Sequence, residues 1–217
     1  MRAKTFSYTP VTTSAAGLAN DVTLATSATL AATAATDGLA HLITVLGNAA
    51  TNHSAKTITI TGTDADGNTL SEGIAGPNGV ATVTTTKYFR TVTSVVASAT
   101  CGADTFDIGW NVVGFSPTIP LDTKQNPFSV GLMTDIAGTI NYTVQYTLQD
   151  VLNWRAREAD APQQGGATFV DNASPMAAAT ADQTSNYTFP ATAMRLKINT
   201  VTNGATIKLS VIQGSNG

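Results

Sequence analysis

The stretch Thr57-Ile58-Thr59-Ile60-Thr61 alternates polar and apolar residues, and it decides the fold class. A period of two places Ile58 and Ile60 on one face of a β-strand and the threonines on the other. The next segment, Asp64-Ala65-Asp66-Gly67-Asn68, consists mainly of residues that tolerate left-handed backbone conformations, so it predicts a turn. We expect a return strand over Thr69 to Ala75, which ends at the Gly- and Pro-containing segment 76–79. This stretch therefore predicts a β-hairpin.

Similar patterns continue in both directions along the chain. Three further strands are predicted between residues 80 and 109, and the apolar run from Leu39 to Leu46 predicts a central strand covered on both faces. Residues 21–36 are interpreted as one or two edge strands, with a short helix as the alternative. From Ile140 to Leu148, every second residue is apolar, which predicts a strand with Ile140, Tyr142, Val144, Tyr146 and Leu148 on one face.

The C-terminal quarter of the chain also predicts strands. Ala193 to Asn199 places Met194, Leu196 and Ile198 opposite Arg195 and Lys197, and Thr206 to Ile212 places Ile207, Leu209 and Val211 on one face. Asn203-Gly204 lies between these two segments. Asn-Gly favours a type I′ turn, in which both residues have positive φ, so we expect a closing hairpin here.

Composition agrees with an all-β protein of two β-sandwich domains, Ig-like or jelly-roll-like. The 217 residues suffice for two small cores, and threonine, which suits strands, is abundant. Two prolines and a glycine interrupt the pattern between Gly114 and Pro120, so we place the boundary there. The expected organisation is an extended arm over residues 1–20, a first sandwich over 21–115 and a second over 116–217.

Charge and cysteine content exclude several classes of partner. Only 12% of residues are charged, the net charge is −3, and basic residues are scattered singly, so we expect no nucleic-acid partner. No apolar stretch is long enough for a membrane span or a signal peptide, so we expect a soluble protein with no membrane partner. Cys101 is the single cysteine, which fits assembly in a reducing cytoplasm.

Candidate metal and catalytic residues are sparse. Asp64 to Asn68 superficially resembles a calcium loop, but Thr69 and Ala75 stand where an EF-hand needs glycine and glutamate, so we interpret this segment as an ordinary turn. His41 is expected to pack within a strand and His53 to lie in a loop, and neither has metal ligands at a suitable spacing. Ser54 and Ser71 lack the glycine-flanked nucleophile elbow.

Two further constellations have a functional and a structural interpretation. Asp150, Glu158 and Asp160 could act as paired carboxylates in glycoside hydrolysis, although solvated contacts with Arg155 and Arg157 are the preferred interpretation. A carbohydrate-stacking platform could be formed by Trp110, Trp154, Tyr142 and Tyr146, but the periodic tyrosines favour a role in the core. We therefore expect no enzyme activity and predict no catalytic, cofactor or metal residue.

Two parts of the chain resemble Ala/Thr-rich β-sandwich structural proteins of tailed-bacteriophage virions. The first comprises Ile58 to Asn68, followed by Gly76-Pro77-Asn78 and Lys87 to Val95. The second comprises Ala193 to Asn199, a short turn, and Ile207 to Gln213. The resemblance implies a non-enzymatic capsid decoration or cement protein without a cofactor, which binds across the junctions of capsid subunits.

The resemblance also implies partners and a location. The partners would be the major capsid protein or another virion protein, and copies of the chain itself, most simply in a homotrimer. The protein would be assembled in the host bacterial cytoplasm and lie on the outer capsid surface. The alternatives are a tail, head-to-tail adaptor or receptor-binding component, since these share the same β-sandwich architectures, and a carbohydrate-binding module.

Overall fold

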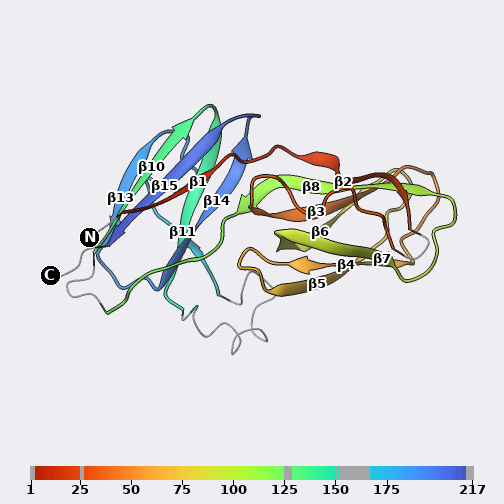
Figure 1. The fold of residues 1–217 in the computed structure, drawn as a ribbon, viewed down its shortest axis with the longest axis horizontal. Coiled ribbons are helices and arrows are strands. Elements are labelled where there is room, and N and C mark those ends of the chain that lie inside the picture. Colours follow the sequence, from red (N-terminus) through yellow and green to blue (C-terminus); the bar gives the residue numbers. More distant parts are fainter. Residues whose placement is uncertain (1–2, 25–26, 125–128, 150, 152–166, 214–217) are drawn as a thin grey trace. The chain divides into compact units, whose positions relative to one another are not determined.

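A computed structural model describes residues 3–24, 27–124, 129–149, 151 and 167–213. These residues form fifteen β-strands, and the protein is all-β with several sheets (Figure 1). The chain divides into two compact units. The N-terminal unit is Thr13–Gly114, and the C-terminal unit combines Phe115–Gly217 with Met1–Thr12. No described helix is long and apolar enough to cross a membrane.

The N-terminal unit contains two layers of strands (Figure 1). One sheet has the order β2-β8-β3-β6 and the other the order β5-β4-β7. The strands are β2 (Ser14–Thr23), β3 (Ala40–Gly47), β4 (Thr57–Thr63), β5 (Thr69–Ala75), β6 (Thr82–Phe89), β7 (Thr91–Ala97) and β8 (Thr105–Phe115). The core side chains include Ile58, Ile60 and Val95 from one sheet and Val45 and Ile108 from the other, and all five are fully buried.

The sequence predicted several of these strands correctly. The hairpin of β4 and β5 is confirmed, with Thr63 opposite Thr69 across the turn, and β3 is buried on both faces. The expectation of edge strands over residues 21–36 is wrong beyond Thr23, where β2 ends. The loop that follows instead hydrogen-bonds to the free edge of β7, with Ala28 N donating to Val95 O over 2.9 Å. Such a covering loop blocks edge-to-edge pairing.

Glu72 joins the facing edges of β5 and β6. Its carboxylate accepts hydrogen bonds of 2.8 Å from the backbone N–H groups of Thr86 and Lys87 and from the Thr86 hydroxyl. Three donors on one carboxylate make charge-assisted bonds, which are stronger than neutral ones. The side chain therefore links the two sheets at an edge where their backbones do not form a ladder.

The C-terminal unit also contains two sheets. One has the order β1-β15-β10-β13, and in the other β11 lies between β12 and β14, with β9 pairing β14. The strands are β1 (Lys4–Tyr8), β9 (Ile119–Pro120), β10 (Val130–Ala137), β11 (Ile140–Thr147), β12 (Val170–Asp171), β13 (Gln183–Tyr187), β14 (Ala193–Val201) and β15 (Thr206–Gln213). Ile207, Leu209 and Val211 are buried as predicted, opposite exposed Lys208 and Ile212.

The segment predicted to be an extended arm forms β-strands over much of its length. Lys4 to Tyr8 forms β1, which pairs with β15 from Val211 back to Ile207. Residues 14–23 form β2, which pairs with β8 within the N-terminal unit. The segment Lys4 to Tyr8 has little apolar periodicity, so its strand conformation depends on the ladder that β15 offers rather than on its own sequence.

The expected hairpin at Asn203-Gly204 is also wrong. Strands β14 and β15 lie in different sheets, since β14 pairs with β11 and β15 pairs with β1 and β10. Only Gly204 has positive φ, at 80°, and Ala205 N donates to Thr202 O over 3.2 Å. A positive φ at the third residue alone is the geometry of a type II turn, not type I′. The turn therefore carries the chain from one sheet to the other.

Candidate functional site

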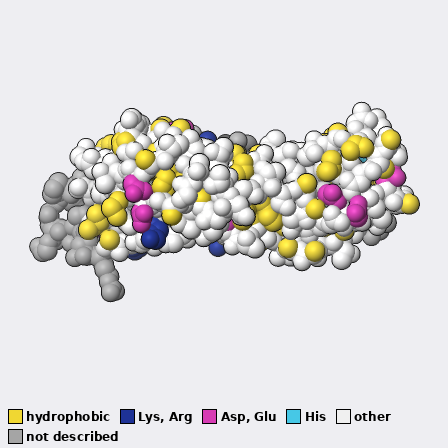
Figure 2. Space-filling model, turned by 90° about the horizontal axis from the view of Figure 1, so that it is seen from above, with side chains coloured by type: hydrophobic (Ala, Val, Ile, Leu, Met, Phe, Trp, Pro, Cys, Tyr) yellow, Lys and Arg dark blue, Asp and Glu magenta, His cyan; other side chains and the backbone are white. Residues whose placement is uncertain are grey.

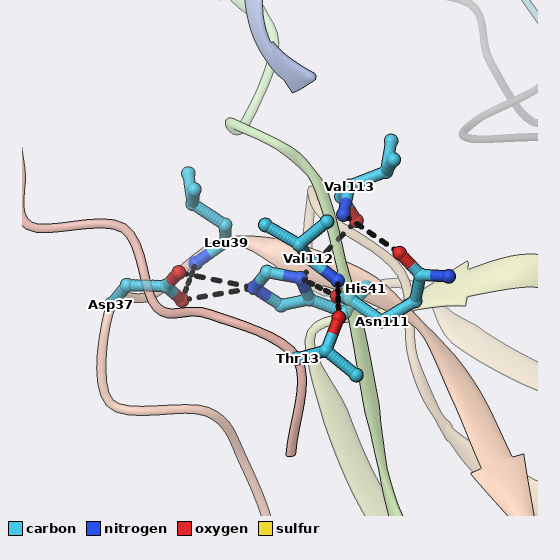
Figure 3. Close-up of polar contacts among 7 residues, drawn as sticks. All are labelled: Thr13, Asp37, Leu39, His41, Asn111, Val112 and Val113. Carbon is cyan, nitrogen blue, oxygen red and sulfur yellow. Dashed lines mark hydrogen bonds and ion pairs between the residues drawn. The ribbon is translucent and has the colours of Figure 1, made fainter. Parts of the chain in front are cut away.

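Both histidines of the chain are buried, and each contacts an aspartate. His41 Nε2 lies 3.1 Å from Asp37 Oδ2, and His41 Nδ1 lies 2.9 Å from Asn111 O and 3.2 Å from Val113 O (Figure 3). A carbonyl only accepts hydrogen bonds, so Nδ1 carries a proton, and Nε2 donates to the carboxylate. Both ring nitrogens therefore face oxygen acceptors, which fix the orientation of the ring.

The local backbone fixes this pair. Asp37 precedes β3, and its Oδ1 accepts a hydrogen bond from Leu39 N over 3.0 Å, which holds the carboxylate beside His41 (Figure 3). The Cε1 atom of the ring lies close to Gly114. A Cβ on Gly114 would be only 2.8 Å from His41 Cε1. The side chains of Asp37 and His41 are 0% and 1% exposed. The prediction that His41 packs within a strand is confirmed, and its ring has no access to a substrate.

His53 has a different set of partners. Its Nε2 lies 2.9 Å from Asp104 Oδ2, and its Nδ1 lies 3.1 Å from Lys56 Nζ. The lysine ammonium only donates hydrogen bonds, so Nδ1 is the acceptor and Nε2 carries the proton. Lys56 Nζ also donates to Thr100 O over 2.7 Å. His53 therefore lies in a loop as predicted, but it is the centre of a buried polar cluster.

Asp104 is the most accessible member of this cluster, with its side chain 27% exposed. A hydrogen bond from the Thr51 side chain lowers the pKa of Asp104, and the hydrogen bond from His53 lowers it further. Both bonds favour the ionised carboxylate. Asp104 therefore stays ionised at neutral pH and orients the His53 ring.

The segment Asp64 to Asn68 closes the β4–β5 hairpin, as expected for a turn. Asp64 is buried, and its Oδ1 accepts hydrogen bonds of 2.9 Å from the N–H groups of Asp66 and Asn68. Gly67 has a φ of 86°. Among the described residues, no group of three or more His, Cys, Asp or Glu side chains is arranged to hold a metal ion. The oxygens that a calcium site would need are used here within the turn.

The serines that were considered as nucleophiles make other contacts. Ser71 Oγ donates to Ile60 O over 3.3 Å, and Ser54 N donates to Asn52 Oδ1 over 2.9 Å. The His41 and His53 rings are occupied by the partners described above. The structure therefore does not assemble a Ser-His-Asp site from these residues.

The aromatic residues considered for sugar stacking are not brought together on a surface. Trp110 and Tyr142 are buried. Tyr146 instead packs against Tyr187 and Phe189, with ring centroids 5.4 and 5.0 Å apart and ring planes tilted by 55° and 60°. The tilted rings do not form one flat platform, although Phe189 in this cluster is 37% exposed. Trp154, Arg155, Arg157, Asp150, Glu158 and Asp160 lie outside the described residues.

Arg195 occupies an environment that the strand pattern did not predict. The alternation in β14 places it on the polar face, yet it is only 8% exposed. Its Cζ lies 4.1 Å from the ring centroids of both Phe115 and Phe169, and its Nε donates to Gln145 Oε1 over 2.7 Å. Stacking between two rings compensates the guanidinium for part of its lost hydration. A buried arginine held in this way has a structural role.

The outer face of the sheet β1-β15-β10-β13 bears a shallow apolar groove, which we call the Gly131 groove. It has a volume of about 290 Å³. Met133 and Ile212 are 49% and 45% exposed beside it. Gly131 has no side chain to fill the space beside Ile212. A Cβ on Gly131 would lie 3.0 Å from Ile212 Cγ2. The groove is lined by Ala3, Gly131, Leu132, Met133, Ser185, Ser210, Val211 and Ile212.

Comparison with known proteins assigns no family to this arrangement. No protein-family model matches the chain. The search of curated proteins gave no significant match.

Proposed function

We propose that this chain is a non-enzymatic structural protein of a tailed-bacteriophage virion, which decorates or cements the capsid by binding across the junctions of capsid subunits. Its two units act as β-sandwich domains of the Ig-like or jelly-roll-like kind. It is assembled in the host cytoplasm and lies on the outer capsid surface. Its partners are the major capsid protein or another virion protein, and copies of itself in a homotrimer.

The non-enzymatic part of the proposal is supported by the two histidines, because both are engaged in contacts within the fold. His41 and His53 are the only histidines of the chain. Each ring nitrogen has a protein partner, and the two residues are 1% and 3% exposed. General acid–base catalysis needs a group within hydrogen-bond reach of the substrate. Neither imidazole can meet that requirement without breaking a contact that holds the fold.

The position of the resembling segments supports the virion part of the proposal. Ile58 to Asn68 forms most of β4 and its turn, and Lys87 to Val95 spans the end of β6 and most of β7. Strand β4 pairs with β5 on one side and β7 on the other. Ile58 to Asn68 and residues 91–95 therefore contribute to one sheet of the N-terminal unit, and Lys87 to Phe89 to the other, a scaffold of the kind that a cement protein requires.

The surface is suited to contact with other proteins. Charged side chains are few on the face shown in Figure 2. The outward residues of β4 are threonines, and in the hairpin Thr61 Oγ1 bonds to Ser71 Oγ over 3.3 Å. Burying hydroxyl and methyl groups in an interface costs less free energy than burying ionised groups. Many weak contacts of this type add up when many copies bind one shell.

Particle stability tests this proposal. Virions that lack the chain should release their DNA at a lower temperature than complete virions, and adding the purified protein should restore the higher temperature. The physical reason is that contacts across subunit junctions stabilise the closed shell. Unchanged thermal release, together with failure of the protein to co-sediment with depleted shells, would rule out cementing and favour a tail, adaptor or receptor-binding role.

A further inference from the structure

Lys56, His53 and Asp104 form a chain of three hydrogen-bonded side chains in the N-terminal unit. The distances are 3.1 Å from Lys56 Nζ to His53 Nδ1 and 2.9 Å from His53 Nε2 to Asp104 Oδ2. The order is amine, imidazole and carboxylate. Activated nucleophiles show the same arrangement. In them, the nucleophile is hydrogen-bonded to a base, and a third group orients that base.

The two contacts of Lys56 remain available when its ammonium group loses one proton. A neutral amine has two N–H bonds and one lone pair, and Nζ has two acceptors in place, Thr100 O at 2.7 Å and His53 Nδ1 at 3.1 Å. With both N–H bonds directed into the protein, the lone pair points elsewhere. Lys56 is half-buried, so a small reagent can reach it.

We propose that Lys56 is a modification site that accepts an acyl group from a thioester, with His53 as the base. In this step, the neutral amine attacks the thioester carbonyl carbon, so an N–C bond forms. The C–S bond then breaks and the thiolate leaves. The proton released from Nζ passes to His53 Nδ1 and from there to the thiolate or to water. The products are an amide on Lys56 and a free thiol, and no oxidant or reductant takes part.

The groups around His53 hold its ring in place as the base. In the described part of the chain these are Lys56 at Nδ1, Asp104 at Nε2 and the Phe106 ring, whose centroid lies 5.4 Å from that of His53. The bond from Nε2–H to Asp104 keeps the acceptor nitrogen Nδ1 directed at Lys56.

Lys87 provides a control within the same unit. It is also half-buried, and its Nζ donates to a backbone carbonyl, Ser71 O, over 2.8 Å. Among the described residues, no histidine contacts its amine. The ratio of acylation at Lys56 to that at Lys87 therefore isolates the contribution of His53 from burial and carbonyl contact.

The experiment treats the full chain with a limiting amount of the acetyl thioester of N-acetylcysteamine and measures acetylation of each lysine by peptide mass spectrometry. We expect Lys56 to react on the order of tenfold faster than Lys87, as a positioned base allows. His53→Gln should bring the ratio of acetylation at Lys56 to that at Lys87 close to one.

The fold of each variant is checked by circular dichroism and thermal melting. If His53→Gln does not fold, Asp104→Asn replaces it, because Asp104 is partly exposed and its loss leaves the His53–Lys56 contact in place. That variant should lower the ratio without removing it. Equal reaction of Lys56 and Lys87 in the wild type, or a ratio that a folded His53→Gln variant leaves unchanged, would overturn the proposal.

Discussion

Tyr142 and Tyr187 in the C-terminal unit are both fully buried, but their hydroxyl groups differ. Tyr142 Oη donates to Ala181 O over 2.9 Å and is hydrogen-bonded to the Thr134 hydroxyl. No described donor or acceptor reaches Tyr187 Oη. Replacing each tyrosine by phenylalanine removes the hydroxyl and keeps the ring, so the two variants compare a bonded and an unbonded buried hydroxyl.

The two substitutions should change stability in opposite directions. Tyr142→Phe leaves the Ala181 carbonyl without its donor, so it should lower the free energy of unfolding by about 1–3 kcal/mol. Tyr187→Phe removes a polar group that was buried without compensation, so it should leave stability unchanged or raise it by about 1 kcal/mol. Urea unfolding followed by fluorescence measures both values, and an unchanged m-value shows that the unfolded states are comparable.

The same pair has a pH signature. Burial raises the pKa of the Tyr187 hydroxyl, and burial also raises that of Tyr142. Above about pH 10 the unfolded chain loses these protons while the folded chain keeps them. The free energy of unfolding should therefore fall as the pH rises above 10, and less steeply in Tyr187→Phe. A loss of more than about 1 kcal/mol in Tyr187→Phe at neutral pH would refute the assignment of an unbonded hydroxyl.

Three further substitutions or truncations test the fold. Asp37→Ala should cost about 1–3 kcal/mol in chemical unfolding, because it leaves the buried His41 Nε2–H without its acceptor; a cost below about 0.5 kcal/mol would contradict that pairing. Gly17→Ala should lower stability by about 1–3 kcal/mol, because its Cβ would lie 2.3 Å from the Trp110 ring, and a wild-type melting temperature would show that the indole moves freely. Residues 13–114 expressed alone should unfold cooperatively in calorimetry, whereas a molten fragment would show that the two units depend on each other.

Local patterns predicted the elements that need only local information. The alternation in Thr57 to Thr61 and the Asp/Gly/Asn turn placed the β4–β5 hairpin, and the apolar run after Leu39 placed β3. The partner of each strand is set by contacts between residues far apart in sequence, and two errors follow from this. Lys4 to Tyr8 becomes a strand through β15, and Asn203-Gly204 connects two sheets instead of two neighbouring strands.

The polar clusters were predicted less well, for a similar reason. His53 and Asp104 are 51 residues apart, so no sequence spacing marks their contact. Asp37 and His41 are only four apart, but that spacing brings two side chains into contact only in a helix, and here a turn brings them together. The alternation of polar and apolar residues in the strand placed Arg195 on its polar face. That side chain is buried because Phe115 and Phe169, from elsewhere in the chain, cover it.

The most direct test of the proposed function is the position of the chain in an intact particle. Electron cryomicroscopy of the virion should show density for both β-rich units on the outer capsid surface, repeated at every equivalent junction of capsid subunits and grouped in threes. Density confined to one vertex or to the tail, or none on the shell, would contradict a role in capsid decoration.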